Sequence, residues 1–532
     1  MMPRGIRILA VLAALAASAG GAAHPAADSV AAPPATIAAF ALDDEAPRLS
    51  RLAQPHQYFD RIGRRAALMG FEDGTFEAWV WPWKVLRQFQ LQFLLGASTQ
   101  PIAARDIVRR ITVTPAATEI TYAWESFTVR AVYLVPENEP GALVLLEART
   151  TAPLTIVAGF LPVLQPMWPA GIGGQSSHWD EDAKAFVISE GQRRARFLCG
   201  SPAAGEMSAP PAHMFADSPL QFRLDVRPGD PPGRFIPIAI AGGDGLKPED
   251  TLVLYRRLVA DASQLYAANV AAARRLKGQT IAVETPDPQL NAALDWGRLA
   301  LHNLLVDNPA LGRGLVAGYG LSGGSARPGF AWFFGGDACA NSLALNSLGD
   351  FAAVRDGLRF LQRWQRGDDH PIRRASPDAP PADVGKMPHE LTQSAALVDW
   401  WHAYRYGYNH ADSTPWYLVA MGDYLHASGD AAFVRESWPS IAAAWRWCRG
   451  RDSDGDGLMD ITGAGLGALA PPAGGHPAGN PHPQGDAPHQ LGALRPDPGP
   501  GGLRGHRRLD RPASLPPPPG ARREYLTNPG MG

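Results

Sequence analysis

The period of the hydrophobic pattern changes near Lys247, and this change constrains the fold more than any other feature of the chain. Before it, β-branched, aromatic and apolar residues fall in short, often alternating runs of the kind that form strands. After it, apolar residues recur at helical spacing. A large antiparallel β-sandwich over residues 36–246, followed by a helical region, is therefore expected. The clearest strand candidates are residues 111–114, 119–124, 127–135, 142–148, 222–226 and 235–240.

The helical region begins with a linker over residues 247–285, in which one helix is predicted over 251–276. A second helix is predicted over 286–306, with a mostly apolar stripe along it. Two helical hairpins follow, and in each a Gly-Asp corner has a Phe soon after it. Repeated hairpins predict an α/α toroid, incomplete here, over residues 286–469. The predicted hairpin helices are 338–348 with 351–364 and 415–427 with 431–448; residues 391–406 are a further short helix candidate.

The N-terminus has the pattern of a secretory signal. Arg4 and Arg7 precede an apolar run at residues 8–17, and small residues follow through Ala23. The run is too short to cross a bilayer comfortably, and no other segment has a membrane-spanning pattern. We therefore expect a signal peptide at residues 1–27, a periplasmic or secreted protein, and no membrane association after cleavage.

Composition narrows the choice of partners. The chain has 532 residues, too many for one ordinary core, and its formal net charge of −2 provides no basic field for nucleic acid. Its three cysteines are far apart and are expected to be buried free thiols. Histidines occur singly, and the loop at residues 320–325 is expected to be flexible and lacks a phosphate-binding motif. No metal and no cofactor is expected.

Residues 470–532 differ abruptly from the rest of the chain. About a quarter of them are Pro, and Val, Ile, Phe and Trp are absent. Such a composition cannot bury enough apolar surface to become ordered. Natural low complexity would explain it, but a change of reading frame in a GC-rich gene explains the abruptness better, since such a change yields Pro, Arg, Gly, Ala and His.

Three acidic residues stand at or near predicted helix starts. Asp337 opens the first helix of one hairpin, Asp412 lies just before the first helix of the other, and Glu390 follows Pro388. In a toroid the first helices of the hairpins point the same way, so these carboxyl groups are expected around one mouth. Taken alone, an Asp before a helix is usually a cap. Pro415 suits the first helical position, which predicts Thr414 or Ser413 as the cap and leaves Asp412 free.

Aromatic residues surround these acids in the sequence. The chain has 15 Trp, several of them in loops, where they either cover a domain interface or stack on sugar rings. Glycoside cleavage needs one protonated carboxyl and one ionised carboxylate in one pocket. The candidate substrate-binding residues are Trp332, Phe333, Asp337, His389, Glu390 and Trp416, and the candidate catalytic residue is Asp412.

An Asp-rich segment follows the second hairpin. Residues 452–460 match an EF-hand loop at several positions, but Gly463 stands where a bidentate Glu is expected. A rigid turn is therefore favoured over a calcium site.

Four motifs, in order and with matching spacing, resemble bacterial amylo-α-1,6-glucosidases of the glycogen-debranching type. They are Arg-Pro-Gly-Phe-Ala-Trp-Phe-Phe-Gly-Gly-Asp at 327–337, Gly-Lys-Met-Pro-His-Glu at 385–390, His-Ala-Asp-Ser-Thr-Pro at 410–415 and Asp-Gly-Asp-Gly-Leu-Met at 454–459. The resemblance covers about residues 286–469. It implies a β-sandwich followed by an (α/α)6 barrel of the six-hairpin glycosidase type, which hydrolyses α-glucosidic bonds in oligo- or polysaccharides.

The same resemblance implies roles for individual residues. Asp412 matches the general acid, Asp337 and Trp332 match residues that bind the terminal sugar, and Glu390 matches a residue lining the pocket. Two departures matter: Gly336 replaces an Arg of the family pattern, and the catalytic base of the family lies in a second half-barrel, which the tail replaces. No residue here is assigned as the base. A glycosidase, a non-catalytic glycan-binding protein and an inactive fragment that folds poorly all remain open.

Overall fold

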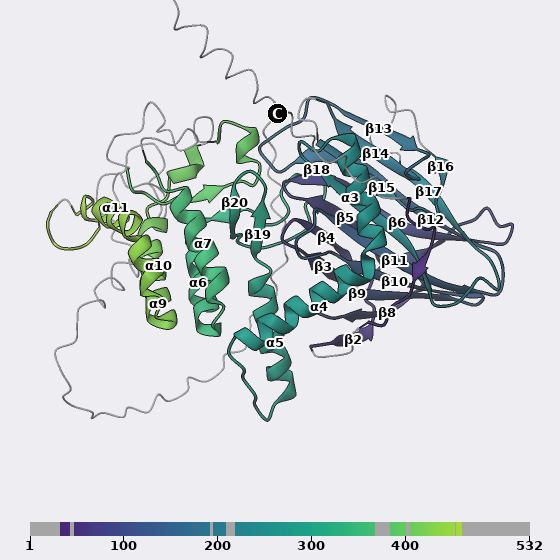
Figure 1. Ribbon diagram of the computed structural model, residues 1–532, viewed down its shortest axis with the longest axis horizontal. Helices are drawn as coiled ribbons and strands as arrows, with labels where there is room; N and C mark the ends of the chain where they lie inside the picture. Colours follow the sequence, from purple (N-terminus) through teal and green to yellow (C-terminus); the bar gives the residue numbers. More distant parts are fainter. Residues whose placement is uncertain are drawn as a thin grey trace, which may run out of the picture. The chain divides into compact units, whose positions relative to one another are not determined.

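The computed structural model describes residues 32–42, 47–191, 195–208, 219–367, 384–400, 405–452 and 454–459. The predicted signal peptide and the Pro-rich tail lie outside these residues. In the described part, the strands of the two large sheets precede the long helices, as the change of hydrophobic period predicted (Figure 1). No helix of this part combines the length and the apolar character needed to cross a membrane.

The N-terminal region is an antiparallel β-sandwich of two sheets, one of ten strands and one of eight. The ten-stranded sheet has the order β13 (Gln175–Asp180), β14 (Ala185–Glu190), β15 (Ala195–Gly200), β18 (Arg234–Gly243), β11 (Gly141–Thr150), β10 (Phe127–Leu134), β9 (Thr118–Trp124), β8 (Val108–Val113) and β2 (Leu49–Leu52), with β1 (Ile37–Ala38) paired to β18. The eight-stranded sheet has the order β16 (Gly205–Ser208), β17 (Leu220–Val226), β12 (Leu154–Pro166), β6 (Trp83–Leu95), β5 (Phe76–Val80), β4 (Ala66–Phe71) and β3 (Tyr58–Ile62), with β7 (Ile102–Ala103) paired to β6. A short helix, α2 (Ala104–Ile107), follows β7.

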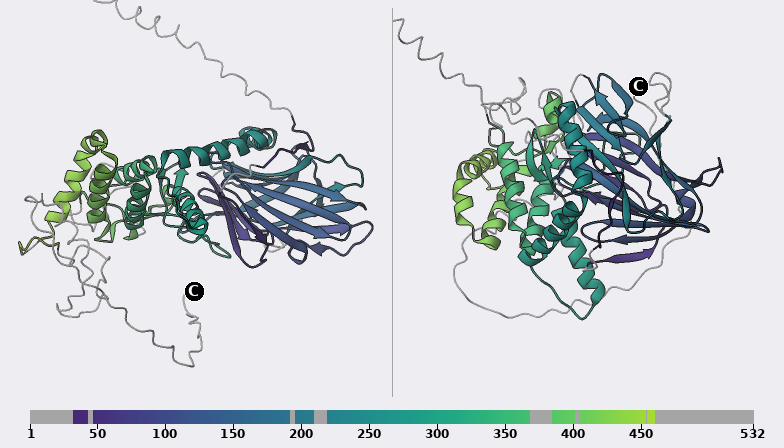
Figure 2. Two further views of the ribbon diagram at one scale, coloured as in Figure 1. Left: turned by 90° about the horizontal axis from the view of Figure 1, so that it is seen from below. Right: turned by 45° about the vertical axis from the view of Figure 1, so that its right-hand side comes forward.

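The ten-stranded sheet is covered on both faces, which explains why some of its strands are apolar throughout. In β11, Val144 and Leu146 belong to the core between the two sheets, whereas Leu143 and Leu145 face a second core. That second core packs the sheet against the helices after residue 247, which lie along the sheet in Figure 2. A strand buried on both faces loses the alternation that marks a half-exposed strand.

The predicted linker helix is two helices, α3 (Pro248–Ala260) and α4 (Ala262–Gln279). The prediction of one helix was wrong because Asp261 leaves helical geometry, with φ −97° and ψ 13°. The predicted helix 286–306 was also too long. Helix α5 (Pro288–His302) ends earlier, because the next residues form strand β19 (Leu305–Asn308), which pairs with β20 (Gly312–Leu315).

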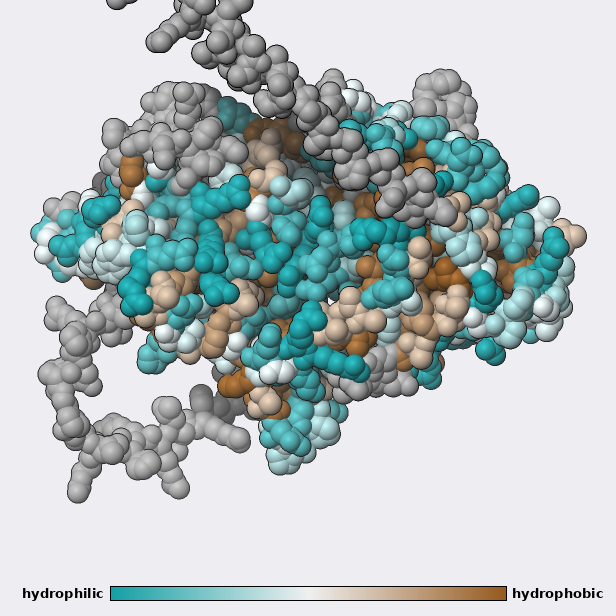
Figure 3. Space-filling view, viewed as in Figure 1, coloured by the Kyte–Doolittle hydropathy of each residue, from teal (hydrophilic) through white to brown (hydrophobic). Residues whose placement is uncertain are grey.

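The two predicted hairpins are present. The first joins α6 (Gly335–Leu348) to α7 (Phe351–Arg363), and the second joins α9 (Ser413–Ser428) to α10 (Ala431–Glu436) and α11 (Trp438–Arg449). At each corner a left-handed Gly ends one helix and an Asp side chain caps the next. In the space-filling view, hydrophilic residues cover much of α6 and α7 (Figure 3).

The second helix of the second hairpin was predicted as one piece over 431–448, and this was wrong. Pro439 in the first turn of α11 has no N–H to continue a helix, so the chain starts a new helix after Ser437. Residues 391–406 were a helix candidate. Part of that range lies outside the described residues, and the rest includes strand β22 (Glu390–Leu391) and 3-10 turns at Ala395–Leu397 and Arg405–Tyr408.

One hydrophobic cluster joins the sandwich to the helical region and contains many of the tryptophans. The buried members from the sandwich side include Trp79 and Trp81, and those from the helical side include Trp332, Trp364 and Trp400. For these residues, covering an interface is the role that the packing supports. The three cysteines, Cys199, Cys339 and Cys448, are free and buried, as predicted.

Candidate active site

The starts of α6 and α9 and the segment at residues 387–390 come together at one place. A two-residue ladder pairs β21 (Phe333–Phe334) with β22, so that Phe334 stands opposite Glu390. Just beyond it, the Gly335 N–H donates to the His389 carbonyl, 2.8 Å away. Helices α6 and α9 pack closely side by side. This arrangement brings Asp337, His389, Glu390 and Asp412 close together, and we call the place where they meet the mouth.

Asp412 is the residue that precedes α9, and its side chain makes no capping hydrogen bond. The helix begins at Ser413, two residues before Pro415, because Asp412 already has helical backbone angles and its carbonyl accepts from the Trp416 N–H at 3.0 Å. The predicted helix start was therefore too late. The prediction of Thr414 or Ser413 as the cap was wrong, because both residues lie within the helix and Asp412 holds the N-cap position, although its carboxylate makes no capping hydrogen bond.

Two histidines accompany the Asp412 carboxylate. Nδ1 of His410 lies 3.7 Å from its Oδ1, and the Ser413 hydroxyl lies 3.3 Å from the same oxygen. The His389 ring stacks on the His410 ring, with centroids 3.3 Å apart and planes inclined by 1°. Burial alone would raise the pKa of Asp412, but the two imidazoles and the hydrogen bonds lower it overall. Asp412 is therefore the ionised carboxylate of the mouth.

The other two carboxyl groups have the opposite tendency. Partial removal from water raises the pKa of Asp337, and the negative charge of Asp412 adds to that rise against a backbone hydrogen bond. Burial also raises the pKa of Glu390, although Arg327 and His410 oppose it. Burial lowers the pKa of His389 to about 4, assisted by His410. The mouth thus combines an ionised carboxylate with carboxyl groups that hold a proton more readily than usual.

The predicted sugar-binding aromatic residues lie at different depths. Trp332 is only 4% exposed and is held between Trp168 and Phe334, with ring centroids 5.8 Å and 5.6 Å away. Phe333 is buried against Phe360, at 4.1 Å between centroids, so it has no surface to offer a sugar. Trp416 packs against the core of the helical hairpins.

The aromatic surface of the mouth includes residues that the sequence did not single out. Phe330 is 64% exposed and meets Phe334 edge to face at 6.0 Å. Phe334 in turn contacts the His389 ring at 5.8 Å. These rings lead from the loop before α6 to the histidines beside Asp412, and they provide flat faces for the apolar side of a sugar ring.

Two groups of side chains have the composition of metal ligands. Donor atoms of His389, His410 and Asp412 lie within 4.8 Å of one another. The two imidazole planes are parallel, however, so their lone pairs cannot converge on one ion without rotation of a ring. The second group is Asp452, Asp454 and Asp456. All three carboxylates accept backbone N–H groups of their own loop, which is the pattern of the rigid turn that was favoured, and Gly463 lies outside the described residues.

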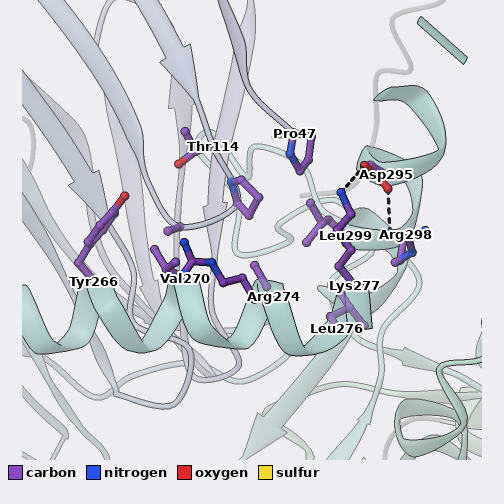
Figure 4. Close-up of a pocket in the computed structure, with 13 residues that line it drawn as sticks. Pro47, Thr114, Tyr266, Val270, Arg274, Leu276, Lys277, Asp295, Arg298 and Leu299 are labelled. Atoms are coloured by element: carbon purple, nitrogen blue, oxygen red, sulfur yellow. Dashed lines mark hydrogen bonds and ion pairs between the residues drawn. The ribbon is translucent and has the colours of Figure 1, made fainter. Parts of the chain in front are cut away.

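A sizeable cavity lies elsewhere. A hollow of about 400 Å³ separates α4 and α5 from the loop after β8, and it is lined mainly by apolar side chains (Figure 4). Asp295 in its lining is already paired with Lys277 at 3.5 Å and Arg298 at 2.8 Å. Among the residues that the structure describes, no second carboxyl group lines it. The carboxyl chemistry therefore belongs to the mouth and not to this cavity.

The loop at residues 320–325, expected to be flexible, is held by the sandwich. Glu77 accepts hydrogen bonds from Ser322 N–H and hydroxyl, both at 2.9 Å, and from Gly323 N–H at 3.3 Å. Lys84 donates to the carbonyls of Gly323 at 2.6 Å and Ser325 at 3.1 Å. That expectation was wrong because these two buried strand side chains, far away in the sequence, satisfy the loop backbone.

No protein-family model and no curated protein sequence matches the chain. Solved structures do resemble it. A putative kojibiose phosphorylase from the human microbiome aligns with a TM-score of 0.50 and 8% identity, over 80% of this chain and 63% of that chain. A bacterial glucoamylase complexed with acarbose aligns with a TM-score of 0.44 and 7% identity, over 79% of this chain and 70% of that chain.

The likeness to the kojibiose phosphorylase structure shows a shared fold, an antiparallel β-sandwich followed by helical hairpins. This chain spans less than two thirds of that protein's length. The debranching type of activity is therefore a matter for proposal.

Proposed function

We propose that the protein binds α-glucosides at the mouth formed by α6, α9 and residues 387–390 and cleaves the glycosidic bond by carboxyl catalysis. The observation that carries this proposal is the opposed pKa tendencies of neighbouring carboxyl groups: lowered at Asp412, raised at Asp337 and Glu390. Glycosidic cleavage uses one carboxyl group that keeps its proton and one that is ionised, and the directions of these pKa shifts favour such a pairing. Support also comes from the exposed aromatic rings and from a fold shared with a kojibiose phosphorylase.

The resemblance assigns the general acid to Asp412, but the surroundings of this residue suit the opposite role. The neighbouring His410 imidazole favours its ionised form, and an ionised carboxylate has no proton to give. In our proposal Asp412 activates water or stabilises the positive charge that develops on the sugar. Glu390, more shielded from water than the exposed Asp337, gives its proton to the leaving oxygen as the bond from C1 breaks.

Two finer features belong to the same proposal. By the motif resemblance we propose an α-glucan or a branched dextrin as the substrate, and the N-terminal signal pattern supports our proposal of export to the periplasm or the medium. Neither feature depends on the geometry of the mouth.

The test is turnover by the full chain. We would follow release of reducing sugar from maltotriose, panose and a branched dextrin, with and without inorganic phosphate. An Asp412→Asn variant should lose turnover by about 100-fold or more and still bind sugar, because a charge is removed while the shape remains. An Asp106→Asn variant is the matched control, since Asp106 is an exposed carboxylate of the sandwich.

The outcomes separate the candidate functions. Turnover without phosphate supports a hydrolase, and turnover only with phosphate supports a phosphorolytic enzyme acting at the same mouth. Sugar binding without turnover under either condition identifies a glycan-binding protein and ends the proposal of catalysis. Full activity in the Asp412→Asn variant would show that the catalytic carboxylate lies elsewhere.

A further inference from the structure

Trp168, which follows a strand of the sandwich, lies beside the aromatic residues of the mouth. Trp168 follows β12, and loops from the helical region hold its backbone from two sides. Its N–H donates to the Ala326 carbonyl at 3.0 Å, and its carbonyl accepts from the Thr392 hydroxyl at 2.6 Å. The Trp168 ring contacts the rings of Trp332, at 5.8 Å, and Trp400, at 6.1 Å. Trp168 is thus fixed in position at the edge of the mouth.

Arg327 covers one face of this ring. Its guanidinium carbon lies 3.8 Å from the centre of the Trp168 ring and 5.6 Å from that of Trp332. The side chain is exposed to solvent, and its guanidinium has no ion pair or hydrogen bond with any residue that the structure describes. The cation lies close enough to Glu390 to oppose the rise in that carboxyl's pKa. A positive charge is therefore held at the mouth near Glu390, without an ion pair to any carboxylate that the structure describes.

Stacking determines what such a cation can bind. With one flat face against an indole, a guanidinium still presents its N–H groups in a planar fork at its edge. That fork matches the two oxygens of a carboxylate or phosphate and forms short, charge-assisted hydrogen bonds with them. Because the stack already restricts the side chain, less conformational entropy is lost when an anion binds.

A neutral sugar suits this place less well. Sugar rings stack on bare aromatic faces, and at 3.8 Å the guanidinium occupies the face of Trp168 that it covers. A sugar ring would have to displace the cation, whereas an anionic substituent would use it.

We infer that Trp168 and Arg327 form an oxyanion-recognition platform beside the carboxyl groups, which takes a carboxylate or phosphate carried by a sugar residue. That the ligand contains a sugar rests on the proposed function. That the ligand carries a negative charge rests on the contact between Arg327 and Trp168 alone. A uronate and a sugar phosphate share the chemistry that the platform recognises. The platform makes charge a determinant of specificity at a mouth otherwise formed of aromatic and carboxyl groups.

The experiment is a calorimetric titration of the full chain with glucose, glucuronate, glucose 1-phosphate and inorganic phosphate, at low and high salt. We expect the charged sugars to bind about tenfold or more tightly than glucose, and this preference to shrink at high salt. A further outcome is that inorganic phosphate alone binds as tightly as the charged sugars do and that this binding is lost in Arg327→Gln. Such a result would identify free phosphate as the source of the oxyanion and would also support the platform.

Three variants locate the effect. Arg327→Gln should reduce the preference for charged sugars to within about twofold, and Arg327→Lys should keep part of it, since an ammonium retains the charge but not the fork. Arg359→Gln is the matched control: Arg359 is also stacked on an aromatic ring, Phe433 at 5.2 Å, but is paired with Glu436 away from the mouth. It should leave the preference unchanged.

The results also separate this inference from the proposed function. Equal affinity for glucose and the charged sugars, absence of binding by all of the ligands, or a preference that persists in Arg327→Gln overturns the platform. Cleavage of neutral glucosides without any preference for charge would leave the proposed function standing and remove the platform. If the protein binds anionic sugars through Arg327 but turns over no substrate, the platform stands and the proposed function is removed.

Discussion

A Cβ atom on Gly335 would lie 2.0 Å from the carbonyl oxygen of Pro388. This contact sets how closely the first turn of α6 approaches the segment that carries His389 and Glu390. The Gly335 N–H donates to His389 at 2.8 Å, so the two backbones meet with no room for a side chain. The geometry of the mouth therefore depends on a glycine for reasons of space.

A Gly335→Ala substitution should open the mouth and destabilise the protein. The methyl group meets backbone, which cannot rotate away, so we expect a loss of about 1–3 kcal/mol in the free energy of unfolding. Urea denaturation measures it. Gly422→Ala is the control: Gly422 is in α9 with nothing within 4 Å of the added methyl, and this change should stabilise by up to about 1 kcal/mol. Equal stability of the two variants would mean that the α6 start and residues 387–390 are not in contact.

The parts of the fold that could be predicted are those determined by nearby residues. The hairpin corners were recognisable because a left-handed Gly and a capping Asp act within one turn, as at Gly349 and Asp350. The break at Asp261 was missed because the flanking residues favour a continuous helix, whereas the break at Ser437 had a local signal in Pro439 that the prediction of one helix overlooked. The apolar strand β11 showed no alternation, since a helix layer covers its outer face.

Part of the site could also be predicted, because some of its residues are positioned by their neighbours in the sequence. Asp337 and Asp412 could be assigned to one mouth because each stands at the start of the first helix of a hairpin, whereas Glu390, predicted near a helix start, lies in strand β22 and reaches the mouth through its pairing with β21. Trp168 and the Glu77–Lys84 pair could not be assigned, because their partners lie more than 150 positions further along the chain. Only tertiary packing brings such residues together.

The pair of Glu77 and Lys84 should contribute strongly to stability through the loop that it holds. Their side chains are 4% and 0% exposed, and the charges lie 3.8 Å apart. Lys84→Met leaves Glu77 buried without its cation and should cost about 3–5 kcal/mol in urea denaturation. In the double variant with Glu77→Gln, the loss should be smaller than the sum of the two single losses, because neither charge remains uncompensated. Additive losses would show that the charges do not interact.

Protonation of His389 should weaken the fold in acid. Its pKa is about 4 in the folded protein, against an ordinary 6.5, so the unfolded chain takes up the proton first as the pH falls. The stability due to neutral His389 is complete above pH 6.5 and is lost progressively towards pH 4. We expect the melting temperature of His389→Gln to fall less steeply over this range than that of the wild type. His178→Gln, at an exposed strand position, is the control, and its melting temperature should depend on pH as that of the wild type does. Parallel curves for wild type and His389→Gln would refute the assignment.

The roles of Glu390 and Asp412 can be distinguished by changing the leaving group. If Glu390 is the proton donor, Glu390→Gln should be about 100-fold slower on maltotriose. It should be nearly normal on an aryl α-glucoside whose phenolate needs no proton. Asp412→Asn should be slow on both substrates, because the ionised carboxylate acts on the sugar and not on the departing oxygen. Steady-state rates with the two substrates provide the comparison. The opposite result is a nearly normal rate of Asp412→Asn on the aryl α-glucoside together with slow turnover of both substrates by Glu390→Gln. It would return the acid role to Asp412. It would also mean that Asp412 is not kept ionised by its surroundings when substrate is bound.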